Sequence, residues 1–206
     1  MSVAPTIKDD LFQEQVIKAA QQLFRQYGLQ KVTMDDVAKA VGKGRSSLYY
    51  YYKNKIEIFG AVMDVEISEI LAEMARAVDK ASGVEQQIRA FCVTKLKEAR
   101  KRREFYATLE GGMDADERSH YAKAERTIRA KMMEQEGGML KKIVTGGIAN
   151  GELRKLDPKE LDSLVFVLLS SIHGLKRELV GDNNSRRLEP AIDTLTRLVV
   201  HGLAAQ

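Results

Sequence analysis

One short segment, Gly44-Arg45-Ser46-Ser47, carries side chains whose types and spacing suit chemistry on a polyanion. An arginine can donate two parallel hydrogen bonds to the edge of a guanine, and serine hydroxyls and backbone amides can reach phosphate oxygens. At the start of a helix, such groups could enter the major groove of duplex DNA. We therefore predict that Arg45, Ser46 and Ser47 contact base edges, with Gly44 as a small residue that begins the helix.

A second short helix must hold this segment in place, and the residues from Thr33 to Gly42 predict it. Thr33 can cap that helix, with Asp36 three residues later completing a shortened capping box. Val37, Ala38 and Val41 give the helix one apolar face. Gly42 then allows the left-handed turn that separates the two helices.

Four consecutive tyrosines follow Leu48 and predict how the second helix is oriented. We expect Leu48 and Tyr52 to point inward, whereas Tyr49, Tyr50 and Tyr51 are candidates for phosphate contacts through their hydroxyls. Asn54 is a predicted N-cap for the next helix, whose first turn would present Lys55 to a phosphate. The full predicted DNA-contacting set is Thr33, Lys43, Gly44, Arg45, Ser46, Ser47, Tyr49, Tyr50, Tyr51 and Lys55.

These residues resemble the TetR (tetracycline-repressor) family of bacterial transcription regulators. The resemblance covers roughly residues 10–65 and rests on Val37-Ala38, Gly42, Arg45-Ser46-Ser47, Leu48-Tyr49, Tyr50-Tyr51, Tyr52, Lys55 and Ile58. Lys43, Gly44 and Tyr52 depart from the family pattern, where an apolar residue, a Ser or Thr cap and a Phe are usual. The resemblance implies a helix-turn-helix that binds an operator. The alternative is a three-helix unit that is purely structural or binds protein.

Composition and charge agree with a polyanion partner. The 206 residues contain 33 Lys and Arg against 29 Asp and Glu, a net charge of +4. Residues 1–60 hold nine Lys and Arg against six Asp and Glu, so most of the excess lies in the predicted DNA-binding segment. Cys92 is the single cysteine, which we expect to be buried and which fits a reducing, cytoplasmic location. We expect neither a signal peptide nor a membrane-spanning segment.

The periodicity of apolar residues predicts an all-α protein. An amphipathic helix runs from Leu11 to Tyr27 and ends at Gly28, and a longer helix runs from about Lys55 to Ala81. Further helices are predicted at 84–101, 104–112, 116–148, 158–181 and 188–204. We predict a helix-turn-helix DNA-binding domain at 1–55, and a C-terminal helical bundle for effector binding and dimerisation at 56–206.

The last two predicted helices are apolar around most of their circumference, which predicts contacts on more than one side. We expect the helices at 158–181 and 188–204 to pair with a second copy as an intersubunit four-helix bundle. The alternative is a larger core within one chain. A twofold dimer of this kind requires a pseudo-palindromic operator, with half-sites about one helical turn or a multiple apart.

The sequence offers little for catalysis. It has three histidines and one cysteine, and it lacks a phosphate-binding glycine-rich motif and a nucleophile beside a base. We predict no enzymatic activity, no cofactor and no metal; Glu134 and Glu136 have no nearby histidine. A cavity among helices could still bind a small molecule. The candidate lining residues, for which ordinary core packing is the alternative, are Phe91, Tyr106, Met113, Tyr121, Met133, Phe166 and His173.

These observations together predict a cytoplasmic, dimeric, DNA-binding transcription regulator. A repressor released from its operator by an unknown small-molecule effector is the first hypothesis. The second is a DNA-binding protein of the same fold whose C-terminal domain binds a protein partner. A helical enzyme that uses the bundle cavity is the third.

Overall fold

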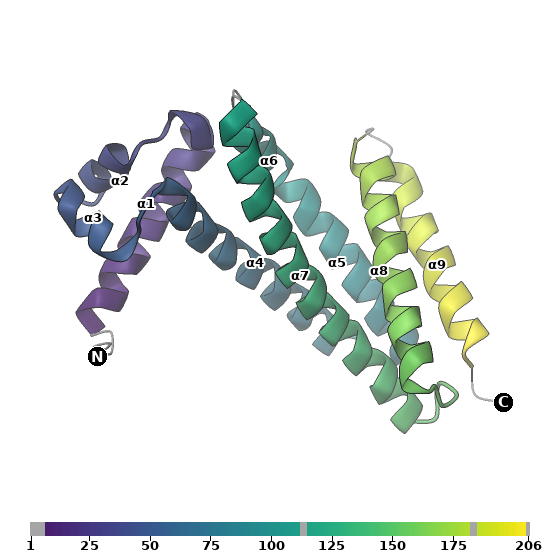
Figure 1. Cartoon of the computed structure of the whole chain (residues 1–206). Helices are drawn as coiled ribbons and strands as arrows, with labels where there is room; N and C mark the ends of the chain where they lie inside the picture. The colour runs from purple at the N-terminus through teal and green to yellow at the C-terminus, as the bar shows by residue number, and fades with distance from the viewer. Residues whose placement is uncertain (1–6, 112–114, 182–184, 205–206) are drawn as a thin grey trace. The chain divides into compact units, whose positions relative to one another are not determined.

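The computed structural model describes residues 7–111, 115–181 and 185–204, and over these residues it is built from helices (Figure 1). The all-α prediction, with an N-terminal helix-turn-helix and a C-terminal helical part, is confirmed. The elements in chain order are α1 (Ile7–Lys31), α2 (Met34–Ala40), α3 (Arg45–Tyr51), α4 (Lys55–Asp79), α5 (Val84–Lys101), α6 (Arg103–Glu110), α7 (Ala115–Ala149), α8 (Pro158–Gly181), the 3₁₀ turn η1 (Ser185–Arg187) and α9 (Leu188–Gly202).

The chain divides into two compact units. The first comprises Met1–Ile67 and Arg103–Arg129, and the second comprises Ser68–Arg102 and Ala130–Gln206. Helices α4 and α7 therefore contribute residues to both units. The predicted boundary after residue 55 separates the segment that binds DNA from the rest of the chain. Contacts within the chain do not test which segment binds DNA, so this boundary stays a prediction.

Helix α1 forms the base of the first unit. Its apolar face buries Val16, Ala20 and Phe24 completely, as the sequence periodicity predicts. Gly28 interrupts the helix with φ 79° and ψ 164°, and a Cβ there would lie 2.7 Å from the carbonyl oxygen of Thr108 in α6. The predicted break at Gly28 is confirmed, although helical structure resumes and continues to Lys31.

The core of the first unit joins α1 to the helix-turn-helix and to α6. Phe24 and Phe59 meet edge to face with ring centroids 6.2 Å apart, and Leu48 of α3 is fully buried beside them in the same cluster. Glu66 is also fully buried, and its Oε1 accepts hydrogen bonds from Gln21 Nε2 at 2.6 Å and Arg25 at 2.5 Å. This core fixes the position of α3, whose opposite face is exposed.

The second unit is a helical bundle in which α5 packs against α8 and α9. Its core includes Phe91, Leu96, Leu140, Leu168 and Ile192. The predicted helix bounds agree closely with α5, α7, α8 and α9. Cys92 is buried in this core, as predicted, and burial raises the pKa of its thiol to about 12.

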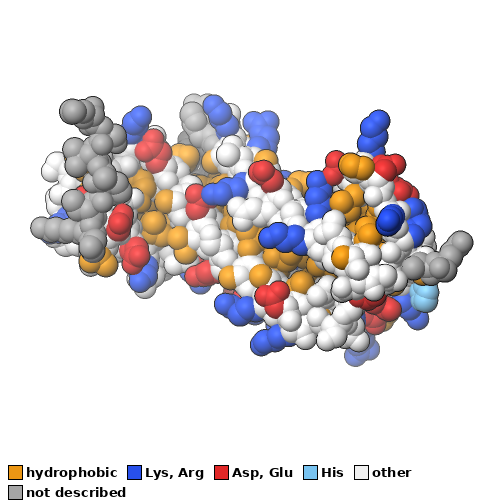
Figure 2. All heavy atoms as spheres, turned by 90° about the horizontal axis from the view of Figure 1, so that it is seen from below, with side chains coloured by type: hydrophobic (Ala, Val, Ile, Leu, Met, Phe, Trp, Pro, Cys, Tyr) orange, Lys and Arg blue, Asp and Glu red, His pale blue; other side chains and the backbone are white. Residues whose placement is uncertain are grey.

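Some apolar side chains of the second unit lie at the surface. Phe166, Val167 and Leu198 are 65%, 55% and 69% exposed, although all three lie in helices with strongly apolar sequences. Figure 2 shows hydrophobic side chains reaching the surface on one face, with Lys and Arg side chains among them. Over the residues that the structure describes, no helix is long and apolar enough to cross a bilayer.

Candidate nucleic-acid interface

The interface begins at the cap of α2, which the sequence predicts correctly. Thr33 has an extended backbone, and its Oγ1 accepts a hydrogen bond from the Asp36 amide at 3.2 Å. The Asp36 carboxylate accepts in turn from the Thr33 amide at 2.9 Å and from the Thr33 hydroxyl at 2.7 Å. These hydrogen bonds lower the pKa of Asp36. The reciprocal cap fixes the start of the helix on which α3 rests.

A tight turn connects α2 to α3. Gly42 has φ +65°, a conformation that other residues rarely adopt, and the amides of Gly42 and Lys43 donate to Lys39 O and Ala38 O, both at 3.0 Å. Gly44 is the N-cap of α3 and makes no side-chain capping hydrogen bond. The departure from a Ser or Thr cap therefore leaves this helix end without a capping side chain. Lys43 and Gly44 are exposed at the turn.

Arg45 lies exposed at the start of α3 and has two partners within the domain. Its guanidinium donates to the Tyr49 hydroxyl at 2.9 Å and 3.3 Å, and lies over the Tyr49 ring at 5.3 Å from the centroid. Its Nε is 3.4 Å from Asp35 Oδ1 of α2. The hydrogen bond to Tyr49 and the charge of Asp35 raise the pKa of Arg45. Ser46 is exposed and Ser47 is partly buried.

The four tyrosines divide between the two faces of α3. Leu48 and Tyr52 are buried, which confirms the prediction that they point inward. Tyr49 is 42% exposed and Tyr50 is 80% exposed. Tyr51 is partly buried. Its ring packs against the ring of Phe12, with the two centroids 5.3 Å apart, and its hydroxyl donates a hydrogen bond to Asp9 Oδ1. That hydrogen bond, together with burial, raises the pKa of Tyr51 to about 12.

Lys55 joins the start of α4 to the end of α1. Its ammonium donates to the carbonyl oxygens of Leu29 at 2.8 Å and Gln30 at 2.9 Å. The preceding residue caps the helix as predicted, because Asn54 Oδ1 accepts from the Glu57 amide at 3.0 Å. The predicted phosphate contacts of Lys55 and Tyr51 stay predictions, and both side chains already hold partners inside the domain.

The structure places the exposed members of the predicted set along the α2–turn–α3 segment. Arg45 and Ser46 are exposed in the first turn of α3, and Tyr49 and Tyr50 are exposed in the next turn. Sequence reasoning missed Asp35 and Asp9 as partners of Arg45 and Tyr51. Asp35 lies in the first turn of α2, where acidic residues are common because they favour the helix N-terminus. Its presence there therefore does not by itself indicate the ion pair with Arg45. Asp9 is 42 residues from Tyr51, and no local pattern indicates that contact.

The predicted ligand-lining residues do not gather in one of the two units. Tyr106 and Tyr121 belong to the first unit. Phe91, Met133, Phe166 and His173 belong to the second, where Phe91 is fully buried and Phe166 is largely exposed. Met113 lies outside the described residues. The assignment of these seven residues to a ligand site stays a prediction.

Comparison with known proteins bears on the same segment. Residues 16–62 match the family model described as "Bacterial regulatory proteins, tetR family", and this range contains the capped α2, the glycine turn and α3. Over these residues, the chain is similar to the TetR family.

Curated relatives match the chain over about a third of its length. The chain is 35% identical to YhgD, an uncharacterized HTH-type transcriptional regulator of Bacillus subtilis. The match runs over 66 residues, which is 32% of each of the two chains. It is 31% identical over 71 residues to the HTH-type transcriptional regulator TtgR of Pseudomonas putida, 34% of this chain and 33% of that one. The matches span about a third of the relatives' length.

Solved structures extend the likeness of fold to the whole chain. A transcriptional regulator from Cytophaga hutchinsonii has a TM-score of 0.65 at 21% identity, covering 93% of this chain and 98% of that one. FadR from Bacillus subtilis, solved in complex with stearoyl-CoA, has a TM-score of 0.63 at 16% identity, covering 92% and 98%. At these identities the likeness concerns the fold, including that of the C-terminal unit.

Proposed function

We propose that this protein is a cytoplasmic, dimeric, DNA-binding transcription regulator, and that it is a repressor released from a pseudo-palindromic operator by a small molecule. The observation that carries the proposal is the exposed face of α3. Arg45 and Ser46 are exposed in the first turn of α3, while Leu48 of the same helix is buried in the core. A rigidly held helix with donors on its outer face matches what groove recognition requires.

The contacts divide into two kinds. Arg45, Ser46 and Ser47 face base edges, and Thr33, Lys43, Tyr49 and Tyr50 hold phosphates. In the free protein Asp35 and Tyr49 hold the Arg45 guanidinium, at exposed sites where ion pairs contribute little. Exchange of Asp35 for a guanine edge is therefore inexpensive. Lys55 and Tyr51 would contact phosphates only by sharing or exchanging their present partners.

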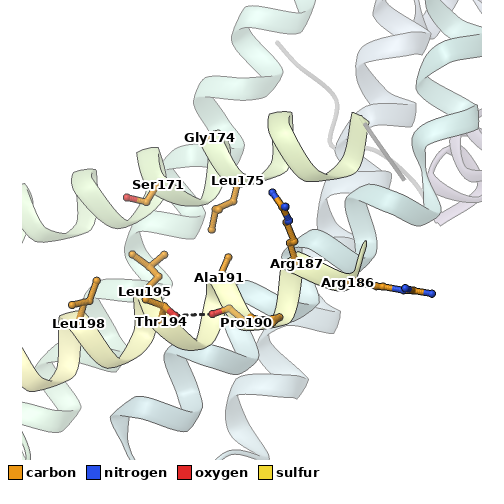
Figure 3. A pocket seen from close by; sticks show the side chains of 10 residues that line it. All are labelled: Ser171, Gly174, Leu175, Arg186, Arg187, Pro190, Ala191, Thr194, Leu195 and Leu198. Carbon is orange, nitrogen blue, oxygen red and sulfur yellow. Dashed lines mark hydrogen bonds between the residues drawn. The ribbon is translucent and has the colours of Figure 1, made fainter. Parts of the chain in front are cut away.

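A second copy of the chain would cover the exposed apolar residues of α8 and α9. A groove of about 650 Å³ lies between these helices, lined mainly by apolar atoms. In Figure 3, Leu175 of α8 and Ala191 and Leu195 of α9 point into it, and Arg186 and Arg187 lie at one end. Exposed Phe166 and Leu198 lie on the same two helices. Twofold pairing buries such a surface and presents two recognition helices.

An effector would act through the C-terminal unit. It can shift the protein between operator-binding and released states only by its difference in affinity for the two. The fold relative FadR was solved with stearoyl-CoA, which supports ligand binding by this type of bundle. A protein partner for the C-terminal unit is the second candidate. If no metabolite in a thermal-shift screen raises the melting temperature of the protein, a protein partner is favoured.

The test compares Arg45→Ala with Lys43→Ala on the best duplex selected from a random pool. Arg45→Ala should relax discrimination at one base pair per half-site by about 1–3 kcal/mol, because the bidentate contact is lost. Lys43→Ala should weaken binding to all sequences alike and reduce the salt dependence by about one phosphate contact per subunit. Lys80→Ala, an exposed cation of the second unit, is the matched control and should change neither.

Two roles of Lys55, phosphate contact and joining α4 to α1, give different experimental results. If it contacts phosphate, Lys55→Met lowers affinity for every duplex at a given salt concentration. If it only joins α4 to α1, the substitution lowers the free energy of unfolding, by about 1–3 kcal/mol for the unpaired carbonyl oxygens, and leaves the salt slope unchanged. Fluorescence anisotropy at two salt concentrations, beside urea unfolding of the same sample, distinguishes these results. An operator preference untouched by Arg45→Ala contradicts the base-reading assignment.

A further inference from the structure

The interior of the C-terminal unit contains an ion pair. Lys95 of α5 donates to Oε1 of Glu136 of α7, and their side chains are 4% and 0% exposed. Phe91, Cys92 and Leu96, near Lys95 on α5, are fully buried in the same unit's core, as is Leu140 one turn beyond Glu136. Removing two charges from water is costly, and apolar residues of similar size often replace such pairs without loss of stability. The pair therefore calls for an explanation other than stability.

The second carboxylate oxygen of Glu136 sets this pair apart. Over the described part of the chain, Glu136 Oε2 is buried and has no hydrogen-bond partner. The other buried acid of this unit, Glu98, accepts from Lys101 on one oxygen and from Arg102 on the other. A buried acceptor without a donor costs free energy and is rare in folded proteins. Glu136 thus holds one open position for a donor.

We propose that Lys95 and Glu136 form the polar anchor of the effector site, and that the effector is a neutral, mostly apolar molecule with one O–H or N–H for Glu136 Oε2. This inference rests on the proposed function and specifies its ligand. The pair is neutral as a whole, so a cationic ligand would leave one excess positive charge in an apolar interior, and an anionic ligand would be repelled by the adjacent carboxylate. A neutral donor satisfies the open oxygen without a third charge.

The helix that carries Glu136 offers a way for a ligand to enter. Both side chains of the pair are closed to solvent, so binding requires α7 to move relative to its neighbours. Gly137 and Gly138 follow Glu136 directly; a Cβ at Gly137 would make ordinary contacts of 3.5 Å and 3.8 Å with Val165 and Leu169 of α8, and one at Gly138 would meet nothing within 4 Å. Packing thus does not require these glycines, and glycine pairs are common sites of helix bending.

The test uses four probes with one apolar skeleton: 4-butylphenol, its methyl ether 4-butylanisole, 4-butylbenzylammonium and 4-butylbenzoate. Isothermal titration of the full chain should show the phenol binding about tenfold tighter than the ether, as a hydrogen bond to a charged acceptor implies. The ether is the more lipophilic, so simple partition into an apolar core gives the opposite order. Both charged probes should bind more weakly than the phenol.

Two variants and one control locate the effect. The double variant Lys95→Met/Glu136→Met should bind the ether as before and lose the tenfold preference for the phenol. Glu136→Gln keeps an acceptor for Lys95 and should reduce the preference for the phenol over the ether. This variant replaces the double variant in the test if the double variant fails to fold. The control Lys141→Met/Asp162→Met removes an exposed ion pair of the same unit, with atoms 2.5 Å apart, and should keep the preference in full.

Three results overturn the inference: no binding of any probe, equal binding of phenol and ether to the wild type, or the ammonium as the tightest ligand. Equal binding would mean that water alone satisfies Glu136. DNA binding by the same preparation is measured in parallel. Intact DNA binding with no phenol preference removes only this inference, whereas absent DNA binding removes the proposed function whatever the probes do.

Discussion

Two ion pairs of this protein involve side chains of similar chemistry in opposite surroundings. Arg45 and Asp35 lie 3.4 Å apart at the surface of the helix-turn-helix, with more than half of the arginine side chain and half of the aspartate side chain in solvent. Lys95 and Glu136 are almost completely buried in the C-terminal bundle. Water makes the first pair weak and exchangeable, whereas the second is costly to form and costly to break. The first suits a residue that must leave its partner to read DNA, and the second suits a fixed anchor.

Removing one cation from each pair gives the largest contrast. Lys95→Met leaves Glu136 buried without its counter-charge and should lower the free energy of unfolding by about 3–5 kcal/mol. Arg45→Met should change it by less than about 0.5 kcal/mol. Urea unfolding followed by circular dichroism measures both. Similar losses from the two substitutions would show that burial does not distinguish the pairs.

Backbone strain at Gly28 gives the next effect and concerns how the DNA-binding unit is held together. Gly28→Ala should destabilise the first unit by about 1–3 kcal/mol, because a left-handed conformation becomes strained, and the new Cβ would also lie 2.7 Å from Thr108 O. Gly60→Ala, inside α4 with nothing within 4 Å of the new Cβ, should stabilise by about 0.5–1 kcal/mol. A gain of stability from both would mean that α6 does not hold Gly28 closely.

The cap of α2 gives a smaller effect on the exposed side of the comparison. Thr33→Ala should lower the free energy of unfolding by about 1 kcal/mol, since the Asp36 amide loses its acceptor. Ser46→Ala, at an exposed site of α3 without a capping role, should leave stability unchanged and affect only DNA binding. Thermal unfolding of the two variants beside wild type separates the roles. Equal melting temperatures for Thr33→Ala and wild type would rule out a stabilising cap.

Acid gives the smallest effect. Hydrogen bonds from Thr33 lower the pKa of Asp36 in the folded protein, so its contribution to stability is complete above the usual aspartate pKa of about 4 and is lost as pH falls through the lower folded value. An NMR titration of the Asp36 carboxyl should show the lowered pKa in wild type and a return toward the usual value in Thr33→Ala. An unchanged titration in that variant would assign the shift to another cause.

The sequence predicts the structure well wherever the partners are close along the chain. The Thr33–Asp36 box, the Gly42 turn, the Asn54 cap and the inward Leu48 all rest on separations of a few residues, and each is present. Helix bounds follow from apolar periodicity for the same reason, because period and punctuation are local properties.

Contacts between distant residues could not be predicted in this way. The Lys95–Glu136 pair spans 41 residues, and the contact of Lys55 with Leu29 spans 26. From the sequence alone, Glu136 is a possible metal ligand that has no nearby histidine, and nothing near it in sequence indicates a lysine on another helix. Phe166 reads as a core or ligand residue from its apolar neighbours, yet its side chain is largely exposed. Packing decides such positions, and one sequence does not specify packing.

Selection of duplexes from a random pool by the full chain, followed by sequencing, tests the central claim most directly. We predict enrichment of sequences with dyad symmetry, with one position in each half-site that loses its preference in Arg45→Ala. The bound species should contain an even number of protein chains by analytical ultracentrifugation. Recovery of unrelated or asymmetric sequences, bound by single chains or not at all at low salt, would contradict the account.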